Sequence, residues 1–322
     1  MLMKWLIRLA IAAGAVAQAA AQTYPAHVVR IVVPFAAGGG ADVTARTIGA
    51  ELSARWGQPV VIENRTGAGS LIGTEAVARA PADGYTLLVT TSQTFTANRF
   101  LYKSLPYDAE RGFVPITLLV QSDQFLLANA ALPVKDLKEL VALARQPQGQ
   151  VTYGSWGIGS EPQLTYEQLN KREGIRLVHV PYKGVAPVLT ALTGGEVQLS
   201  VGSAGVAGAL IRAGRLKPLA IAGQKRNRQF ADVPTTAELG YPYLRASILI
   251  GLWAPSGTPA PVLERIGTDI RALLKNPAFA EKHFTGIGYD VIANTSEEFA
   301  TLLREETARI GDVVQAANIK PE

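Results

Sequence analysis

The sequence predicts an α/β protein of two domains, each a mostly parallel sheet flanked by helices. Short apolar runs rich in β-branched residues alternate with longer amphipathic segments through most of the 322 residues. This alternation is typical of strands joined by crossover helices, and several of the strand-to-helix turns are rich in glycine. No fixed-period repeat is present.

Each element follows from local periodicity and from the start and stop signals around it. The predicted strands are Val28–Val33, Val60–Glu63, Thr86–Thr90, Phe125–Ala128, Val151–Gly154, Leu177–His179, Val197–Val201, Pro218–Ala222 and Leu249–Ala254. The predicted helices are Asp42–Arg55, Gly69–Ala80, Leu137–Gln146, Glu161–Arg172, Val185–Thr193, Val206–Ala213, Pro261–Lys275 and Ser296–Val314.

The chain is predicted to leave the first domain and to return to it later. We expect a boundary near Leu118–Asp123 and a return near Tyr241–Ile250, where a tyrosine- and proline-rich turn precedes a new apolar run. Residues 22–122 and 247–322 would then form an outer domain, and residues 123–246 an inserted one. Two crossings of this kind produce a hinge and a cleft, where ligands usually bind.

Residues 1–21 have the charged, apolar and small-residue order of a secretory signal peptide. Lys4 and Arg8 lie beside an apolar core from Trp5 to about Val16, and small residues lead to Ala21. The core is shorter than the ~20 residues that span a bilayer, so a retained anchor is the weaker alternative. We expect cleavage after Ala21 and an exported, soluble protein.

Composition excludes several classes of protein. The 31 basic residues only mildly exceed the 26 acidic ones, and they lack the clustering and interleaved aromatics of a nucleic-acid binder. Because the chain has no cysteine, it has no disulfide, no lipidated N-terminal cysteine, no thiol catalysis and no cysteine–zinc site.

The most informative segment runs from Val29 to Arg46. A buried strand is predicted first, three glycines follow at positions 38–40, and a helix is expected to begin near Asp42. A helix start presents free N–H groups and the positive end of the helix dipole, which suits a carboxylate or a phosphate. The alternative is a glycine-rich turn without a ligand. The candidate ligand-binding residues are Phe35, Ala36, Ala37, Gly38, Gly39 and Asp42.

The same order of strand, glycines and helix start recurs in the predicted inserted domain. Ser160 is placed as an N-cap, and Pro162 falls in the first helical turn. Trp156 is either a core or lid aromatic, or a face for a ligand ring. With one such helix start in each domain, we expect an anion held mainly by backbone donors. The candidates here are Gly154, Ser155, Trp156, Gly157, Gly159 and Ser160.

A third glycine-rich turn, Asn64–Gly73, follows another predicted strand. Its glycine spacing differs from the dinucleotide-binding pattern, so no cofactor is predicted. Ser92 follows a further strand and is expected at the same edge of the sheet, near the cleft.

Motifs of catalysis are absent from the sequence. Gly202–Gly205 has the wrong spacing for a nucleophile elbow, and no Walker lysine motif occurs. His27, His179 and His283 lie in unrelated contexts, so neither a catalytic triad nor a metal site is predicted. We therefore expect a binding protein and no enzyme activity.

Motifs along most of the chain match one known family. They are Tyr24-Pro25, Val33–Gly39 with Asp42, Val61–Gly69 with Ile72-Gly73, Pro81–Leu87, Val180–Gly184, Asp232–Thr235 and Ala254–Pro259. In these motifs the sequence resembles the Bug family, the periplasmic solute-binding receptors of tripartite tricarboxylate transporters.

This resemblance implies a Venus-flytrap (periplasmic-binding-protein) fold, a periplasmic location, no cofactor and no catalysis. It also implies that a ligand carboxylate is held between Phe35–Asp42 and Gly154–Ser160, with Asp42 either touching the ligand or only capping its helix. The implied partners are a small organic acid and membrane permease subunits, not nucleic acid. Further wall residues would be Thr66, Gly67, Ser92, Tyr182 and Ser203.

The sequence departs from the family at positions that would decide which ligand is bound. Trp156 replaces a small residue, Gln163 a histidine and Gln198 an aspartate, while Ile248–Ile250 replaces a segment that often carries tryptophan. A bulky Trp156 would narrow the pocket or favour an aromatic or planar acid. Two alternative functions also stay open: a signalling module that docks on a sensor kinase, and an exported α/β enzyme.

Overall fold

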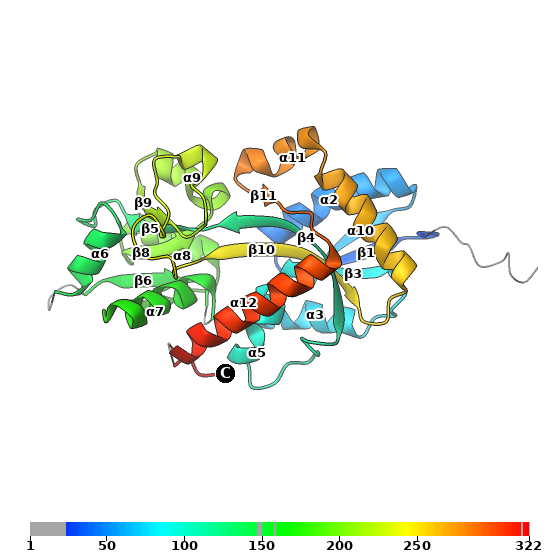
Figure 1. Ribbon diagram of the computed structural model, residues 1–322, viewed down its shortest axis with the longest axis horizontal. Coiled ribbons are helices and arrows are strands. Elements are labelled where there is room, and N and C mark those ends of the chain that lie inside the picture. The colour runs from blue at the N-terminus through cyan, green and yellow to red at the C-terminus, as the bar shows by residue number, and fades with distance from the viewer. Residues whose placement is uncertain (1–23, 147–149, 158, 317, 322) are drawn as a thin grey trace, which may run out of the picture.

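The computed structural model describes residues 24–146, 150–157, 159–316 and 318–321. Two sheets flanked by helices lie side by side along the long axis of the molecule (Figure 1). The predicted signal peptide lies outside the described residues. Within them, no helix combines the length and the apolar character needed to cross a membrane.

The first sheet has the strand order β11-β4-β10-β3-β1-β2. β1 is parallel to β2 and β3, whereas β10 is antiparallel to β3 and β4, and β11 is antiparallel to β4. Buried side chains of α2 and α10 pack on one face, and those of α3 and α12 on the other. The strands are β1 (Val29–Val33), β2 (Val60–Asn64), β3 (Thr86–Thr91), β4 (Phe113–Asp123), β10 (Ser247–Pro255) and β11 (Asp290–Val291).

The second sheet has the order β7-β6-β8-β5-β9. β6 is parallel to β7 and β8, whereas β5 is antiparallel to β8 and β9. α6 and α7 cover one face, and α8 and α9 cover the other. The strands are β5 (Phe125–Asn129), β6 (Thr152–Ser155), β7 (Val178–Pro181), β8 (Leu199–Gly202) and β9 (Leu216–Ile221).

Several helices end where a glycine adopts a left-handed conformation that other residues rarely take. Gly57 after α2 and Gly174 after α7 both have positive φ, and their N–H groups close the last helical turn. The helices are α2 (Gly40–Trp56), α3 (Leu71–Ala78), α4 (Gln93–Thr96), α5 (Asn98–Leu101), α6 (Leu137–Ala144), α7 (Glu161–Glu173), α8 (Val185–Gly194), α9 (Ala204–Arg212), α10 (Ala260–Leu274), α11 (Pro277–His283) and α12 (Ser296–Ala316), with 3-10 turns η1 (Ala68–Ser70), η2 (Arg228–Phe230) and η3 (Thr285–Ile287).

The α/β class is confirmed, and every predicted strand and helix overlaps an observed one. The sheets are, however, mixed and not mostly parallel. We call each sheet with its helices one half of the molecule. β10 and β5 each enter their sheet from the other half, and each runs antiparallel to both of its neighbours. β4, β11 and the helices α4, α5 and α11 were not predicted. The alternation rule expects a helix between strands, whereas β4 leads straight into β5.

The chain crosses between the sheets at two adjacent places. Gln124 alone separates β4 from β5, and its N–H donates to the carbonyl of Ala246, which directly precedes β10, at 2.9 Å. Ala222, after β9, also lies at this crossing, because its N–H donates to the Gln124 carbonyl at 2.8 Å. The predicted limits of the two domains remain a prediction.

Strand directions make two sheet edges face each other across this crossing. β3 and β4 both run antiparallel to β10, so β4 ends at the edge where β1, β2 and β3 end. β5 begins opposite Gly202, the last residue of β8. The carboxyl ends of the parallel strands in both sheets therefore point toward the crossing. We call these the first and second carboxyl edges.

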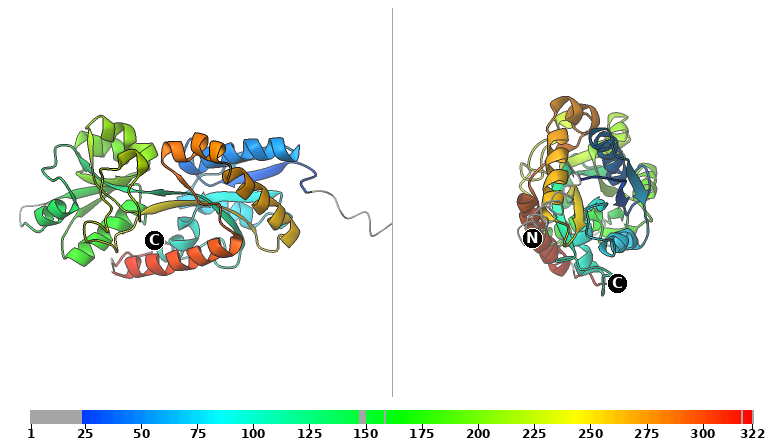
Figure 2. Two further views of the ribbon diagram at one scale, coloured as in Figure 1. Left: turned by 45° about the horizontal axis from the view of Figure 1, so that its top comes forward. Right: turned by 90° about the vertical axis from the view of Figure 1, so that its right-hand side faces the viewer.

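α12 provides another connection between the two halves. Its apolar residues Ile310, Val313 and Val314 form one buried cluster with Leu101 of α5 and Leu164 of α7. Figure 2 shows α12 extending from the first sheet along one side of the molecule to α7.

Candidate ligand-binding site

The first carboxyl edge carries the turns that follow β1, β2 and β3. They contain loop 1 (Phe35–Gly39), the pair Thr66 and Gly67, and Ser92. Because adjacent parallel strands end here, the predicted residues of the first half are brought to one edge.

Loop 1 is held in place by polar side chains beneath it. Gly38 has φ +84°, and its N–H donates to Oδ2 of Asp42 at 2.9 Å. Nδ2 of Asn64 donates to the Phe35 carbonyl at 3.0 Å and to Oδ1 of Asp42 at 2.9 Å. Arg46 pairs with the same carboxylate at 2.9 Å. The loop is therefore fastened to both β2 and α2.

Both carboxylate oxygens of Asp42 are thus engaged by the protein itself. Burial alone would raise the pKa of Asp42, but the hydrogen bonds from Arg46, Gly38 and Asn64 outweigh it and hold the pKa below its ordinary value. The N–H groups of Gly40, Ala41 and Asp42 have no acceptor in the part of the protein that the structure describes. The first turn of α2 therefore offers free donors above a fixed, ionised carboxylate.

The second carboxyl edge carries loop 2 (Trp156, Gly157, Gly159 and Ser160), which leads into α7. The N–H of Gly159, with φ +71°, donates to Oε1 of Gln163 at 2.6 Å. Ser160 Oγ donates to the Gly157 carbonyl at 2.6 Å, and Ser155 Oγ donates to the same carbonyl at 3.0 Å. Ile158 lies outside the described residues.

The two loops share one fastening scheme. In each, a glycine with positive φ donates its N–H to the side chain four residues later, in the first turn of the helix. Asp42 performs this role in loop 1, and the neutral Gln163 performs it in loop 2. Sequence reasoning missed Asn64, Arg46 and Gln163 as anchors. The spacing of glycine and a polar residue four positions apart was the available signal.

The remaining predicted residues lie on these two edges. Ser92 is buried, and its N–H donates to the Leu249 carbonyl at 2.8 Å. The Tyr182 N–H donates to the Ser155 carbonyl at 2.8 Å, and Ser203 is buried directly before α9. Trp156 is half-buried and packs against the core of the second sheet. Both sequence-based interpretations of Trp156 therefore remain predictions.

Contacts on both sides of the crossing bring the edges together. Gln93 Nε2, beside Ser92, donates to Oε2 of Glu161 at 2.7 Å. A side chain at Gly159 would meet Leu101, so loop 2 lies directly against α5. On the other side, Gln229 Nε2 donates to the Gly286 carbonyl at 2.8 Å.

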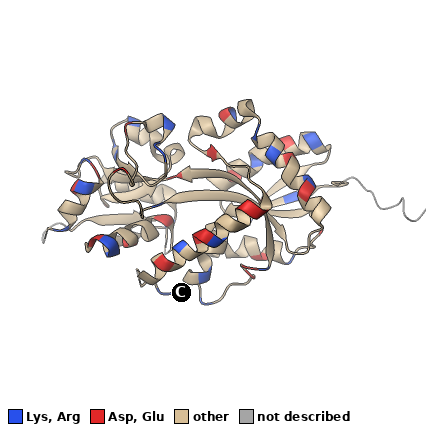
Figure 3. Cartoon of the chain, viewed as in Figure 1, with Lys and Arg blue, Asp and Glu red and all other residues tan. Residues whose placement is uncertain are grey.

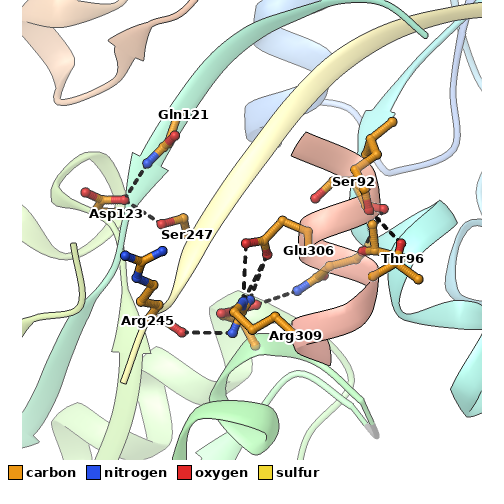
Figure 4. A network of polar contacts seen from close by, with 12 residues as sticks. Ser92, Thr96, Gln121, Asp123, Arg245, Ser247, Glu306 and Arg309 are labelled. Atoms are coloured by element: carbon orange, nitrogen blue, oxygen red, sulfur yellow. Dashed lines mark hydrogen bonds and ion pairs between the residues drawn. The ribbon is translucent and has the colours of Figure 1, made fainter. Parts of the chain in front are cut away.

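Glu161 is a buried acid at the start of α7, next to loop 2. Burial raises the pKa of its carboxyl to about 7, although the nearby Arg309 and the hydrogen bonds from Gln93 and the Ser247 N–H act in the opposite direction. Figure 4 shows Arg309 of α12 between Glu306 and the carbonyl of Arg245. An ionisable group thus lies where both halves meet.

A second acid marks the crossing itself. Asp123 ends β4 and accepts hydrogen bonds from Ser247 Oγ at 2.5 Å and Gln121 Nε2 at 2.9 Å (Figure 4). Burial raises the pKa of this carboxyl. Among the described residues, no group of three or more histidine, aspartate or glutamate side chains is arranged to hold a metal ion.

Charged side chains of both signs are interspersed over the outer helices (Figure 3). The two arginines near loop 1 are already paired. Arg46 binds Asp42, and Arg65 pairs with Glu63 at 2.5 Å. The arrangement offers backbone and hydroxyl donors to an anion, without a free arginine or lysine in the contacts described above.

Comparison with known proteins gives consistent matches over the chain. The family model described as "Tripartite tricarboxylate transporter family receptor" matches residues 44–319. Protein BugT of Bordetella pertussis is 34% identical over 309 residues, covering 96% of this chain and 94% of BugT.

Two similar structures were solved with a ligand. R. palustris Rpa4515 with adipate is 33% identical, with TM-score 0.85, over 93% of this chain and 100% of that one. MatC from Rhodopseudomonas palustris with bound malate is also 33% identical, with TM-score 0.79, over 90% of this chain and 100% of that one.

Proposed function

Because the chain belongs to the tripartite tricarboxylate transporter receptor family, we propose that it is a periplasmic receptor that captures a small carboxylate and delivers it to a membrane permease. The ligand would lie between the first and second carboxyl edges. Residues 22–122 with 247–322 and residues 123–246 would form the two domains that close around it. We propose that the protein binds its ligand without changing it chemically.

The observation that carries this proposal is the pair of helix starts at facing edges. The first turn of α2 offers the N–H groups of Gly40, Ala41 and Asp42. At α7, the N–H groups of Glu161 and Gln163 have no acceptor among the described residues. Free N–H groups at a helix start bind carboxylates through both hydrogen bonds and the helix dipole.

The ligand class follows from the same donors and from the relatives. Two carboxylates at opposite ends of one molecule would match one helix start each. Two structures at 33% identity were solved with the dicarboxylates adipate and malate. Thr66, Gly67, Ser92, Tyr182 and Ser203 would line the space between. We propose a small organic acid with two or more carboxylates.

A thermal-shift screen with mono-, di- and tricarboxylates tests the proposal, after bound ligand has been removed by unfolding and refolding. A ligand at about 100 times its dissociation constant adds roughly 2.7 kcal/mol to the free energy of unfolding, which raises Tm by several degrees. Mass spectrometry of acid released from the purified protein identifies the natural ligand. If no organic acid raises Tm, the proposed ligand class is wrong.

A matched pair of variants places the ligand. Ala37 is an exposed residue of loop 1, so Ala37→Glu adds a negative charge beside the α2 start without disturbing the core. Like charges separated by several ångströms repel by roughly 1 kcal/mol or more, so affinity should fall about tenfold. Ala37→Gln adds a side chain of the same length without charge and should cost much less. Equal effects of the two variants would place the ligand elsewhere.

Delivery to a permease has its own test. Deletion of the receptor should abolish cellular uptake of the acid that it binds. Normal uptake combined with a lost transcriptional response would instead support docking on a sensor kinase.

A further inference from the structure

His179 is linked to loop 2 through the hydroxyl of Ser155. It is on β7, opposite Tyr153 of β6, and its ring stacks on the Tyr153 ring with centroids 5.0 Å apart and planes at 19°. Its Nε2 lies 2.6 Å from Oγ of Ser155, a fully buried residue at the end of β6. His179 is thus an ionisable base connected by hydrogen bonds to the loop that leads into α7.

The Ser155 hydroxyl makes the hydrogen on Nε2 of His179 matter for loop 2. Ser155 Oγ has one hydrogen, and its neighbours are His179 Nε2, the Gly157 carbonyl at 3.0 Å and the Gly157 N–H at 3.3 Å. When Nε2 carries a hydrogen, it donates to Oγ, and Oγ donates to the Gly157 carbonyl. All these groups are then satisfied together, in the neutral Nε2–H tautomer as well as in the imidazolium, so a proton added at Nδ1 leaves these bonds intact. When Nε2 is bare, Oγ must donate to it and loses the Gly157 carbonyl.

Neighbours of His179 come from β6 and α7. Tyr153 of β6 stacks on His179, and Tyr166 of α7 packs on the other ring of this pair, Tyr153. Burial raises the pKa of both phenols, so they stay neutral. Glu167 of α7 accepts a hydrogen bond from Tyr153 at 2.7 Å and favours the charged imidazolium. Burial acts more strongly and lowers the pKa of His179. An anion at the α7 start would add negative charge and oppose the effect of burial.

We propose that His179 takes up a proton when a carboxylate binds at loop 2, which supplies the positive charge that the backbone donors lack. This inference rests on the proposed function and deepens it. His179 acts through Ser155, so it is a positioning residue that also compensates the charge of the ligand. Binding should then strengthen as the pH falls, by up to tenfold for each pH unit over the range in which His179 titrates.

The direct test is an NMR titration of the histidine side-chain nitrogens of the wild-type protein, with adipate and malate as the first probes of a carboxylate panel. His179 should titrate at a pH about one unit or more higher in the saturated protein than in the free protein. His27 and His283 serve as internal controls and should not change. Calorimetry at one pH in Bis-Tris and in Tris should report uptake of up to one proton per ligand.

A variant tests the same inference independently. His179→Gln keeps an N–H donor for Ser155 but cannot carry a charge, so its affinity should match that of the wild type at about pH 8 and should not rise at lower pH. A steep pH dependence that survives in H179Q overturns the inference.

The outcomes separate the two proposals. If a carboxylate shifts the amide signals of Gly40 and Glu161 but the His179 titration does not move, the proton uptake is wrong and the receptor function stands. If no acid of the panel binds, both are overturned.

Discussion

Asp42 holds loop 1 through hydrogen bonds that only an ionised carboxylate can complete. It accepts from the Gly38 N–H, from Asn64 and from Arg46 while lying almost fully buried. Such charge-assisted bonds are stronger than neutral ones. If a carboxylate binds as proposed, Asp42 would act on it indirectly, through the position of the free N–H groups above it.

Asp42→Ala should lower the free energy of unfolding by roughly 2 kcal/mol and weaken the binding of every carboxylate, because loop 1 loses its anchor. Urea denaturation and calorimetry measure the two effects. Asp108→Ala is the matched control, since Asp108 also accepts two backbone N–H groups but on an exposed turn. It should cost less stability and leave affinity unchanged. Normal affinity in D42A would contradict the anchoring role.

Glu161 should make stability depend on pH near neutrality. The folded protein binds its proton more tightly than the unfolded chain, because the pKa rises from 4.5 to about 7. Stability is therefore lost as the pH rises between these values, by roughly 3 kcal/mol at most, and the loss is complete above about pH 7. Glu161→Gln should remove this loss.

Urea denaturation across this pH range compares wild type with E161Q. Gln93→Ala is the control, because it removes a hydrogen bond that lowers the pKa of Glu161 but keeps the carboxyl. In Q93A the loss of folding stability with rising pH should persist and should extend to higher pH. An identical pH profile in wild type and E161Q would show that Glu161 does not titrate in this range.

At the scale of elements, the turns before α2 and α7 use the same backbone conformation under different packing. Gly38 and Gly159 both have positive φ. An added Cβ at Gly38 meets nothing within 4 Å, whereas at Gly159 it meets the side chain of Leu101. Loop 2 is therefore packed against the other half of the molecule at its glycine, whereas Gly38 of loop 1 is held by its hydrogen bond to Asp42.

This contrast predicts unequal effects of one substitution. Gly38→Ala should destabilise by about 1 kcal/mol, the cost of a left-handed alanine. Gly159→Ala should cost roughly 1–3 kcal/mol more, because Leu101 must also move. Thermal unfolding with calorimetric enthalpy measures both. Equal costs would mean that Leu101 yields without strain.

At the scale of the whole molecule, the two halves are joined at the crossing and by α12. Gln124 and Ala246 lie side by side at the crossing, and α12 packs against both α4 and α7. Domain closure around a ligand would turn about a few residues of this kind.

Ligand binding should therefore reduce the radius of gyration in X-ray scattering. The acid that gives the largest thermal shift is added at saturation, and the same protein in sodium chloride of equal ionic strength serves as the unliganded control. An unchanged radius in a protein shown to be saturated would contradict closure.

Much of the fold could be predicted because local periodicity specifies strands and helices. The runs at β1, β5 and β10 are apolar enough to be recognised alone, and the glycines at 38–40 mark a turn whatever surrounds them. β4 and β11 were missed because their pairing depends on strands far away in the chain. The candidate loops were found, but their anchors were not.

By itself the sequence determined the α/β class, the two glycine-rich helix starts and the resemblance to a receptor family, because each depends on neighbouring residues or on motifs read in order. The tertiary structure decided the mixed sheets, the meeting of the two carboxyl edges and the hydrogen bonds of Asp42, Glu161 and His179. These partners lie 22, 68 and 24 residues apart, so only the folded chain brings their polar atoms within bonding distance.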